Sequence, residues 1–184
     1  MDQIQFSCAA PEQRSRVSVL LRYFLMIPHM IVLVLYGIAA EFVVFFHWFA
    51  IVFTGKHNQG MWNFTEKYAR YSTRVNAYMQ LQHDQFPQFG PDDPSSPVQV
   101  SFPFVADANR LTNALRIFWM IPAAIIAYFL SIGAAFVMVI SWIIIVGTGK
   151  QPAGMHQFIG KVLRYSTQVS GYALLLVDTY PSYS

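Results

Sequence analysis

The sequence predicts an all-α integral membrane protein built from two tandem repeats, and three observations support this. Two long runs, 22–56 and 116–150, are apolar and almost free of charge, as expected of segments in a membrane. The 184-residue chain is 55% hydrophobic and 11% charged, whereas soluble domains carry about 25% charged residues. The second run also repeats the first.

The repeat has a fixed register of 94 positions without gaps. Between 16–89 and 110–183, about 31 of roughly 74 positions are identical, far above chance. Repeat-equivalent residues include Arg22 and Arg116, Pro28 and Pro122, Trp48 and Trp142, and the closing sequences Thr54-Gly55-Lys56 and Thr148-Gly149-Lys150. The pattern predicts repeat 1 at 1–89, a Pro-rich linker at 90–97 and repeat 2 at 98–184.

Composition narrows the class of protein further. Aromatic residues make up 16% of the chain, which fits the aromatic belts of membrane proteins. The pI is 9.1, but the basic residues flank the apolar runs and form no separate basic stripe, so we expect no nucleic-acid partner. The single cysteine, Cys8, excludes an internal disulfide framework.

Each repeat opens with a short alternating segment, at 3–7 and at 97–102. Alternation of apolar and polar residues is typical of a strand, and the two copies are expected to pair as a β-ribbon. A helix start is predicted after each strand, at Pro11–Arg16 and at Ala106–Arg110, because proline and acidic residues favour the first turn.

The apolar runs are predicted to form short transmembrane hairpins over about 17–53 and 112–147. Each hairpin contains two helices of about 17 residues, with turns near Gly37–Ala40 and Ser131–Ala134. Basic residues flank both ends of each run, and the positive-inside rule places basic ends on one side of the membrane. The alternative is a surface helix to Ile27 followed by one long tilted span from Pro28 to Phe53.

The hairpins predict how the repeats insert. With two spans in each repeat, both copies enter the membrane in the same orientation. A glycine at the end of each run, Gly55 and Gly149, is expected to cap a helix in the left-handed conformation. Proline at positions 28 and 122 is expected to bend each copy at the same depth.

An amphipathic helix follows each hairpin, at about 60–83 and 154–177. Apolar residues recur at spacings of three and four, with basic residues on the other faces, as in a helix that lies in the membrane interface. Interfacial aromatic anchors are expected at Trp62, Tyr71, Tyr78, Tyr165 and Tyr172. Contacts to lipid headgroups are expected from Arg14, Arg16, Arg22, Lys56, Lys67, Arg70, Arg74, Arg116, Lys150, Lys161 and Arg164.

Four motifs together resemble a bacterial membrane family catalogued as domain of unknown function 4389. They are Ile27-Pro28-His29, Trp48 with Thr54-Gly55-Lys56, the sequence R-Y-S-T-R-V-N-A-Y at 70–78, and Asp84-x-x-Pro87. The resemblance covers nearly the whole chain twice. The second copy departs from it at Ala123, in place of the histidine, and at Gln168-Val169-Ser170-Gly171-Tyr172. The resemblance implies a bacterial cytoplasmic membrane protein and transfers no activity.

The polar residues that break the repeat are the candidate site. His29, Glu41 and His47 lie within the first apolar run, where the second has Ala123, Ala135 and Ser141. Ionisable groups in hydrocarbon are costly and therefore mark functional positions. With a turn near Ile38, the two histidines lie at similar depth and can face one another as a proton relay or half of a metal site. The alternatives are hydrogen-bonded structural histidines or contact with another subunit.

No serine, cysteine or aspartate constellation supports catalysis, so we expect no enzyme activity, no metal and no cofactor. The first expectation is an accessory or scaffold subunit that binds membrane lipids and other membrane subunits or itself. The alternative is a lipid-binding or membrane-shaping hairpin protein. A small transporter or proton relay at His29, Glu41 and His47 is the third. The charge pattern predicts a multi-pass protein with both termini cytoplasmic.

Overall fold

A computed structural model of the chain describes residues 5–8 and 14–183. Its elements are, in order, β1 (Gln5–Cys8), α1 (Arg16–Thr54), α2 (Gln59–Met79), β2 (Val98–Ser101), α3 (Arg110–Ala114), α4 (Arg116–Thr148) and α5 (Ala153–Ala173). The expected strand residues before Gln5 and the expected helix start at Pro11 lie outside the described residues.

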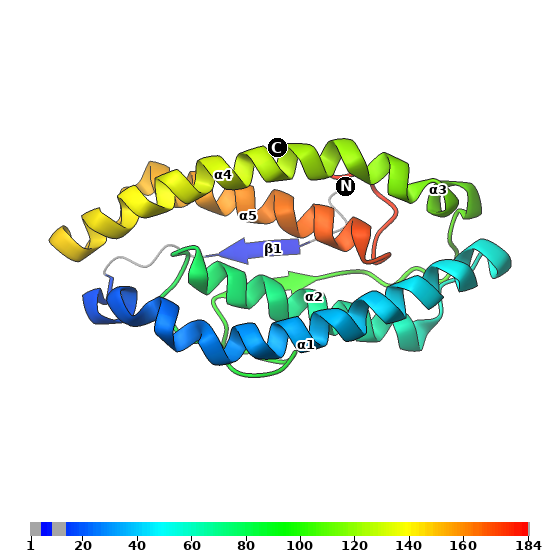
Figure 1. The fold of residues 1–184 in the computed structure, drawn as a ribbon, viewed down its shortest axis with the longest axis horizontal. Helices are drawn as coiled ribbons and strands as arrows, with labels where there is room; N and C mark the ends of the chain where they lie inside the picture. Colours follow the sequence, from blue (N-terminus) through cyan, green and yellow to red (C-terminus); the bar gives the residue numbers. More distant parts are fainter. Residues whose placement is uncertain (1–4, 9–13, 184) are drawn as a thin grey trace.

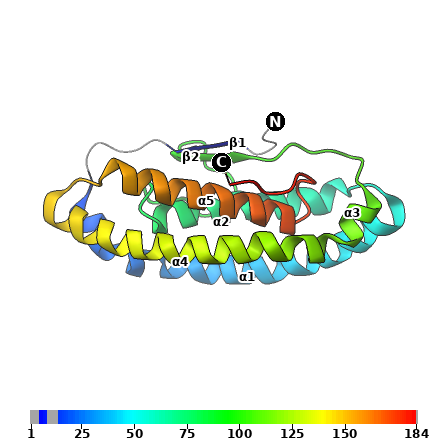
Figure 2. The same ribbon diagram turned by 90° about the horizontal axis from the view of Figure 1, so that it is seen from above.

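The elements form three layers, which Figure 2 shows edge-on. The long helices α1 and α4 form the lowest layer in that view, α2 and α5 pack on them, and the β1–β2 ribbon covers α2 and α5. Both long helices are bowed, with their ends turned towards the side of the ribbon. In Figure 1, α1 and α4 lie along opposite edges of the molecule and come together at its two ends.

The two repeats are related by an approximate two-fold axis, so α1 and α4 run antiparallel. The backbone N–H of Arg14 donates to the Gly149 carbonyl, and the N–H of Ala108 donates to the Gly55 carbonyl, both at 3.0 Å. Because these are repeat-equivalent bonds, the start of each long helix is joined to the end of the other.

The predicted hairpins are wrong. α1 is one continuous helix of 39 residues, and no turn interrupts it between Gly37 and Ala40. The small residues there serve packing: Ala40 is fully buried, and a Cβ added to Gly37 would lie 3.0 Å from the hydroxyl of Tyr68 on α2. The prediction that both repeats insert in the same orientation required two helices in each apolar run. Because each run forms no hairpin, that prediction is wrong as well.

In the second repeat, the long helix begins in two pieces. Asn109 caps the short α3, and the helix breaks at Leu115 before α4 continues unbroken through the expected turn at Ser131–Ala134. Pro28 and Pro122 both lie inside helices, as expected from their positions.

The glycine caps are confirmed. Gly55 and Gly149 have φ values of 72° and 76°, and each N–H bonds to a carbonyl of the last helical turn. At Gly55, an added Cβ would also lie 2.7 Å from Arg110 Nε, because the two repeats meet at this point. The T-G-K sequence therefore ends a long helix and permits the close approach of the other repeat.

The predicted β-ribbon is confirmed over the described residues. β1 and β2 pair antiparallel, with Gln5 opposite Ser101 and Cys8 opposite Val98. The side chains of Val98, Val100 and Phe102 are buried in a core shared with Trp62 and other residues of α2 and α5. The ribbon therefore forms a third layer that packs on α2 and α5.

The two amphipathic helices are present and end four residues earlier than predicted. Leu81 and Leu175 adopt left-handed conformations, with φ of 58° and 61°. The N–H of Gln82 bonds to the Ala77 carbonyl, and the N–H of Leu176 to the Gly171 carbonyl, which closes each helix in a Schellman motif. No glycine marks these ends, so the sequence pattern alone extends both helices too far.

Candidate functional site

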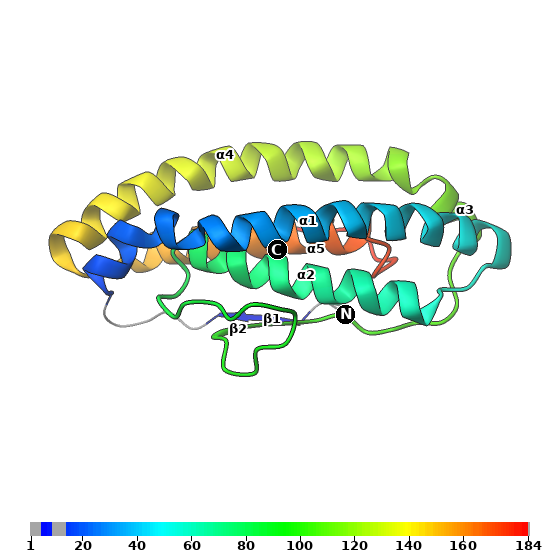
Figure 3. The ribbon, with the colours of Figure 1, turned by 60° about the horizontal axis from the view of Figure 1, so that its bottom comes forward.

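The main unusual feature of the molecule is the exposed apolar face of α1 and α4. Figure 3 shows the course of these two long helices. Only a narrow stripe of α1 is fully buried, at spacings close to a heptad, and most of its other positions are exposed. Among exposed positions of α1 and α4, charge occurs only at Arg16 and Glu41. By length and composition, both helices are long and apolar enough to cross a membrane.

The exposed positions of α2 and α5 are chemically opposite to this face. They are repeat-equivalent, namely Gln59, Gly60, Asn63, Lys67 and Asn76 on α2, and Ala153, Gly154, Gln157, Lys161 and Ser170 on α5. All are small or polar. The molecule therefore has an apolar side made by the long helices and a polar side made by the other two layers.

Buried arginines fix the long helices to the second layer. Arg22 pairs with Asp84 at 2.7 Å and donates to the Tyr78 carbonyl, while its guanidinium lies 4.2 Å from the centre of the Tyr78 ring. Arg116 repeats this arrangement with Asp178 and the Tyr172 carbonyl. The aspartate of the Asp-x-x-Pro motif is thus an internal counter-ion that holds the end of α2 or α5 against the start of a long helix.

The predicted site of His29, Glu41 and His47 does not come together. The two histidines are 18 residues apart on one continuous helix, which separates them by about 27 Å along the helix axis. His29 is fully buried, accepts or donates a 2.7 Å hydrogen bond with the Tyr71 hydroxyl, and stacks on Phe89 at 4.0 Å. His47 is fully buried and lies 3.3 Å from the Nδ1 of His57. The hydrogen-bond partner of each histidine therefore comes from its own repeat.

The two histidines are therefore too far apart to form the predicted proton relay or half of a metal site. Within the described ranges, no group of three His, Cys, Asp or Glu side chains is placed to hold a metal ion. Burial lowers the pKa of His57 below its ordinary value, and nearby Asp178 partly opposes this effect. The His47–His57 pair is then a neutral contact that joins the end of α1 to the loop before α2.

Several expected lipid contacts are instead internal. Trp62, Tyr71, Tyr78, Tyr165 and Tyr172 are all buried, so they pack the layers together and do not anchor the protein at an interface. Arg14, Arg22, Arg74 and Arg116 are buried as well and bind partners within the chain. Amphipathic spacing predicts which face of α2 and α5 is apolar, but that face packs on the protein itself.

Of the other basic residues expected to contact headgroups, Arg16, Lys56 and Lys150 lie at the ends of the long helices, whereas Lys67, Arg70, Lys161 and Arg164 lie on α2 and α5. Arg16, Lys56 and Lys150 are exposed, and so is Arg110, which sequence reasoning left out of the set. Arg110 donates to the Thr54 carbonyl at 3.0 Å, which places it beside Lys56. Arg16 lies beside Gly149 and therefore near Lys150. Because Arg110 is the repeat equivalent of Arg16, the repeat register was the signal that could have identified it.

The chain matches the family described as Domain of unknown function (DUF4389) twice, over residues 16–90 and 110–184. The chain belongs to this family. No curated protein and no solved structure matches it.

In this DUF4389 protein, each match to the family covers one long helix, one amphipathic helix and the Asp-x-x-Pro segment that follows. The two copies are consistent with the duplication expected from the sequence. The linker and β2 fall between the two matches, so the ribbon lies largely outside the family motifs.

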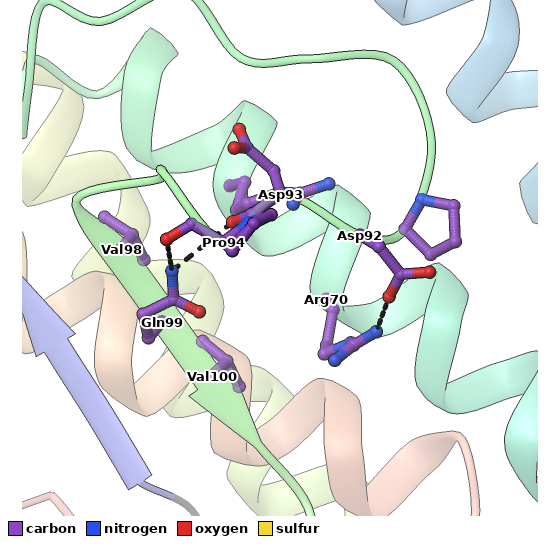
Figure 4. A pocket seen from close by; sticks show the side chains of 9 residues that line it. Arg70, Asp92, Asp93, Pro94, Val98, Gln99 and Val100 are labelled. Atoms are coloured by element: carbon purple, nitrogen blue, oxygen red, sulfur yellow. Dashed lines mark hydrogen bonds and ion pairs between the residues drawn. The ribbon is translucent and has the colours of Figure 1, made fainter.

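A polar pocket of about 370 Å³ lies between α2, the linker and β2 (Figure 4). Arg70 pairs with Asp92 and Glu66, and Arg74 donates to the Gly90 carbonyl. Gln99 reaches back from β2 to linker carbonyls, including that of Pro94. The arginines of this pocket are already engaged, so they hold the linker on α2 and do not present a free anion site.

A second pocket, of about 470 Å³, opens between α1, α4 and the end of α5. Most of its wall is apolar, and Phe45 and Ile117 at its edge are themselves exposed on the apolar face. Glu41, the third member of the predicted site, lines this pocket, and the buried Arg116 forms another part of the wall. The pocket therefore lies between Glu41 and the exposed apolar face of the long helices.

Proposed function

We propose that the protein lies flat in one leaflet of a membrane and acts as a lipid-binding, membrane-shaping protein. In this arrangement, α1 and α4 lie parallel to the membrane plane with their apolar face in the hydrocarbon. α2, α5 and the ribbon lie on the aqueous side. The observation that carries the proposal is the packing of the charged α2 and α5 along the same long helices that expose the apolar face.

Helix length supports a flat orientation. At 1.5 Å per residue, the 39 residues of α1 extend over about 58 Å. To fit a hydrocarbon core of about 30 Å, α1 would have to tilt by about 60°, beyond the usual range of about 0–40°. A helix that lies in the plane has no such limit.

The second layer supports the same orientation. If α1 crossed the membrane, α2 would lie beside it in hydrocarbon and take Glu66, Lys67 and Arg70 with it. Each charged side chain at the centre of a bilayer costs at least about 2.5–3.5 kcal/mol, and α5 would add Lys161 and Arg164. A flat orientation leaves all of these side chains in water or among headgroups.

Charge at the ends of the long helices is the third support. Arg16 and Lys150 are exposed near one end of the pair of long helices, and Lys56 and Arg110 are exposed near the other. Both ends of the long helices bend towards the side of the ribbon in Figure 2. Both ends of each apolar run then lie on one side of the membrane without a hairpin. The cytoplasmic leaflet, which attracts basic segments, is the leaflet that we propose.

Insertion into a single leaflet is the basis of the proposed shaping role. Amphipathic elements that fill only the boundary between headgroups and acyl chains bind in a curvature-sensitive way. The convex apolar layer of Figure 2 presents its middle deepest into the leaflet. A role as an accessory or scaffold subunit, and the absence of enzyme activity, stay predictions.

Spin labels at two repeat-equivalent pairs of exposed positions test the orientation. Phe24, Phe42, Phe118 and Phe136 are each changed to cysteine in a Cys8→Ser background, labelled, and reconstituted in phosphatidylcholine vesicles. We expect all four labels at similar depth in one leaflet, from their accessibility to oxygen and to a water-soluble relaxer. Labels at Asn63 and Gln157 are the controls and should remain in water.

A spanning orientation gives a different result. Phe24 and Phe42 are then separated by about 27 Å along α1, which places them at very different depths. Labels at those two positions in opposite leaflets would refute the flat orientation. Shielding of the labels at Asn63 and Gln157 from the water-soluble relaxer would do the same.

A further inference from the structure

We infer that the pocket of about 470 Å³ binds one membrane lipid with a primary-amine headgroup, of the phosphatidylethanolamine class. In this site, an acyl chain fills the apolar pocket and the ammonium group pairs with Glu41. The inference rests on the proposed flat orientation, which brings the pocket to the lipid. Its volume falls within the range of about 300–1,000 Å³ that is usual for small-molecule sites.

The comparison of the two repeats shows which side chains leave space for the pocket. Val44 and Ala173 line it, and their repeat equivalents are Met138 and Met79. Met138 packs against the cluster of Val19, Leu81 and Ile145, and Met79 packs against the cluster around Met26. Two small side chains therefore leave space where two methionines fill the equivalent place.

The mouth of the pocket points to a lipid as its occupant. Phe45 and Ile117 are about 60% exposed, and both belong to the apolar face that meets hydrocarbon in the proposed orientation. An acyl chain can enter from this face without crossing water. A water-soluble ligand would have to cross the hydrocarbon first.

Glu41 supplies the headgroup chemistry. The Glu41 side chain is exposed beside the apolar pocket, and Tyr68 is an electrostatic neighbour of it. Its carboxylate forms no hydrogen bond or ion pair with any residue in the described ranges. A charge in such surroundings is stabilised by an opposite charge with hydrogen bonds. A primary ammonium donates hydrogen bonds to a carboxylate, whereas the quaternary ammonium of phosphatidylcholine has no N–H to donate. The second repeat has Ala135 here, so the carboxylate belongs to one side only.

Arg116 contributes less to the identification. Its Nε is buried and has no acceptor among the described residues, but the same holds for its repeat equivalent Arg22. The features that distinguish the two sides are the space beside Val44 and Ala173 and the carboxylate of Glu41.

The test measures which lipids stay bound to the full-length protein. The protein is reconstituted in nanodiscs that contain equal amounts of phosphatidylethanolamine and phosphatidylcholine, released in the gas phase, and examined by native mass spectrometry. We expect one retained lipid, with phosphatidylethanolamine favoured about tenfold, as a charge-assisted hydrogen bond provides.

Three variants divide the site into its parts. Glu41→Gln keeps the shape and removes the charge, so a lipid should remain bound with no preference between headgroups. Val44→Met with Ala173→Met copies the residues of the other repeat and should abolish retention of either lipid. Val34→Met, on the exposed apolar face and outside the pocket lining, is the control and should retain lipid as the unchanged protein does.

Each other outcome overturns the inference. If the unchanged protein retains the two lipids equally, Glu41 does not select the headgroup and the inference is wrong. Retention of no lipid, or undiminished retention by the double methionine variant, removes the pocket as the site and leaves a protein side chain as the alternative occupant. The spin-label depths are measured separately, so the flat orientation can stand when this lipid site fails.

Discussion

Asp84 is the residue at which two buried cations of the first repeat converge. Its carboxylate lies 3.0 Å from Arg14 and 2.7 Å from Arg22, and its second oxygen accepts the N–H of Ser15. Asp178 takes the same place in the second repeat, where it pairs with Arg116. The two aspartates therefore have the same task with different numbers of arginine partners.

Asp84→Asn should destabilise the protein by on the order of 3 kcal/mol, because it leaves two buried guanidinium groups without their carboxylate. Asp178→Asn should cost less, since Asp178 is more exposed and pairs with one arginine. Unfolding in detergent micelles, followed by circular dichroism, measures both values. An equal cost for the two variants would contradict the internal counter-ion role that we assign to Asp84.

His83 is buried beside Arg14, Arg22 and Asp84, and its repeat equivalent is Val177. Burial and the positive charge of Arg22 lower its pKa to about 4, from an ordinary value of 6.5. The folded protein therefore keeps His83 neutral in a range where the unfolded chain binds a proton. Stability contributed by the neutral form is present above about pH 6.5 and is lost as the pH falls towards 4.

We expect the free energy of unfolding to fall by on the order of 2–3 kcal/mol between pH 6.5 and pH 4 through His83 alone. His83→Val, which copies the second repeat, should flatten this part of the profile. The comparison needs only the difference between the two pH profiles, because other titrating groups contribute equally to both. Superimposable profiles would show that His83 is not the group responsible.

At the scale of the element, α1 is a long helix that contacts its own protein through one narrow stripe. Val19, Met26, Ala40, His47 and Ile51 are buried along it, while most intervening positions are exposed. Ala40 is fully buried, whereas its neighbour Ala39 is exposed. Adjacent alanines of the same helix therefore have opposite environments.

Ala40→Leu should destabilise the protein by about 1–3 kcal/mol, because the larger side chain overpacks the contact between helices. Ala39→Leu adds the same atoms on the exposed side and should change stability by less than about 0.5 kcal/mol. Thermal unfolding of the two variants under one set of conditions checks this difference. Two equally stable variants would mean that the helix is rotated relative to the structure, or bent into the hairpin expected from its sequence.

At the scale of the whole molecule, two tryptophans hold the antiparallel long helices together. Trp48 Nε1 donates to the Asn113 carbonyl at 2.9 Å, and Trp142 Nε1 donates to the Val19 carbonyl at 3.1 Å. The two bonds are repeat-equivalent and lie near opposite ends of the pair. Each joins one repeat to the other.

Trp48→Phe and Trp142→Phe should each cost about 1 kcal/mol, the usual net value of a hydrogen bond, with a further loss from the smaller ring. Because the two contacts are far apart, the costs should add in the double variant. Double-mutant analysis of unfolding checks this expectation. A coupling energy well above about 0.5 kcal/mol would show that the two ends do not act independently.

The sequence by itself determined the repeat, the two long apolar runs, the ribbon, the amphipathic helices and the glycine caps. These features depend on local signals: composition, periodicity, turn chemistry and a fixed register between copies. The family match and the described elements confirm them. The same register gives the repeat equivalent of each residue, and it relates the Trp48–Asn113 contact to the Trp142–Val19 contact.

Only the tertiary structure decided what the apolar runs contact. Gly37 and Ala40 permit a tight turn and a close helix contact equally well, and which of these they serve depends on Tyr68 and the rest of α2, far along the chain. Likewise, amphipathic spacing shows that Tyr71 and Tyr172 lie on the apolar faces of α2 and α5, but not whether lipid or protein covers those faces. Whether a side chain is buried, and what it contacts, depends on segments that are far apart in the sequence. Patterns within one segment therefore cannot predict it, and the packing of the layers decides it.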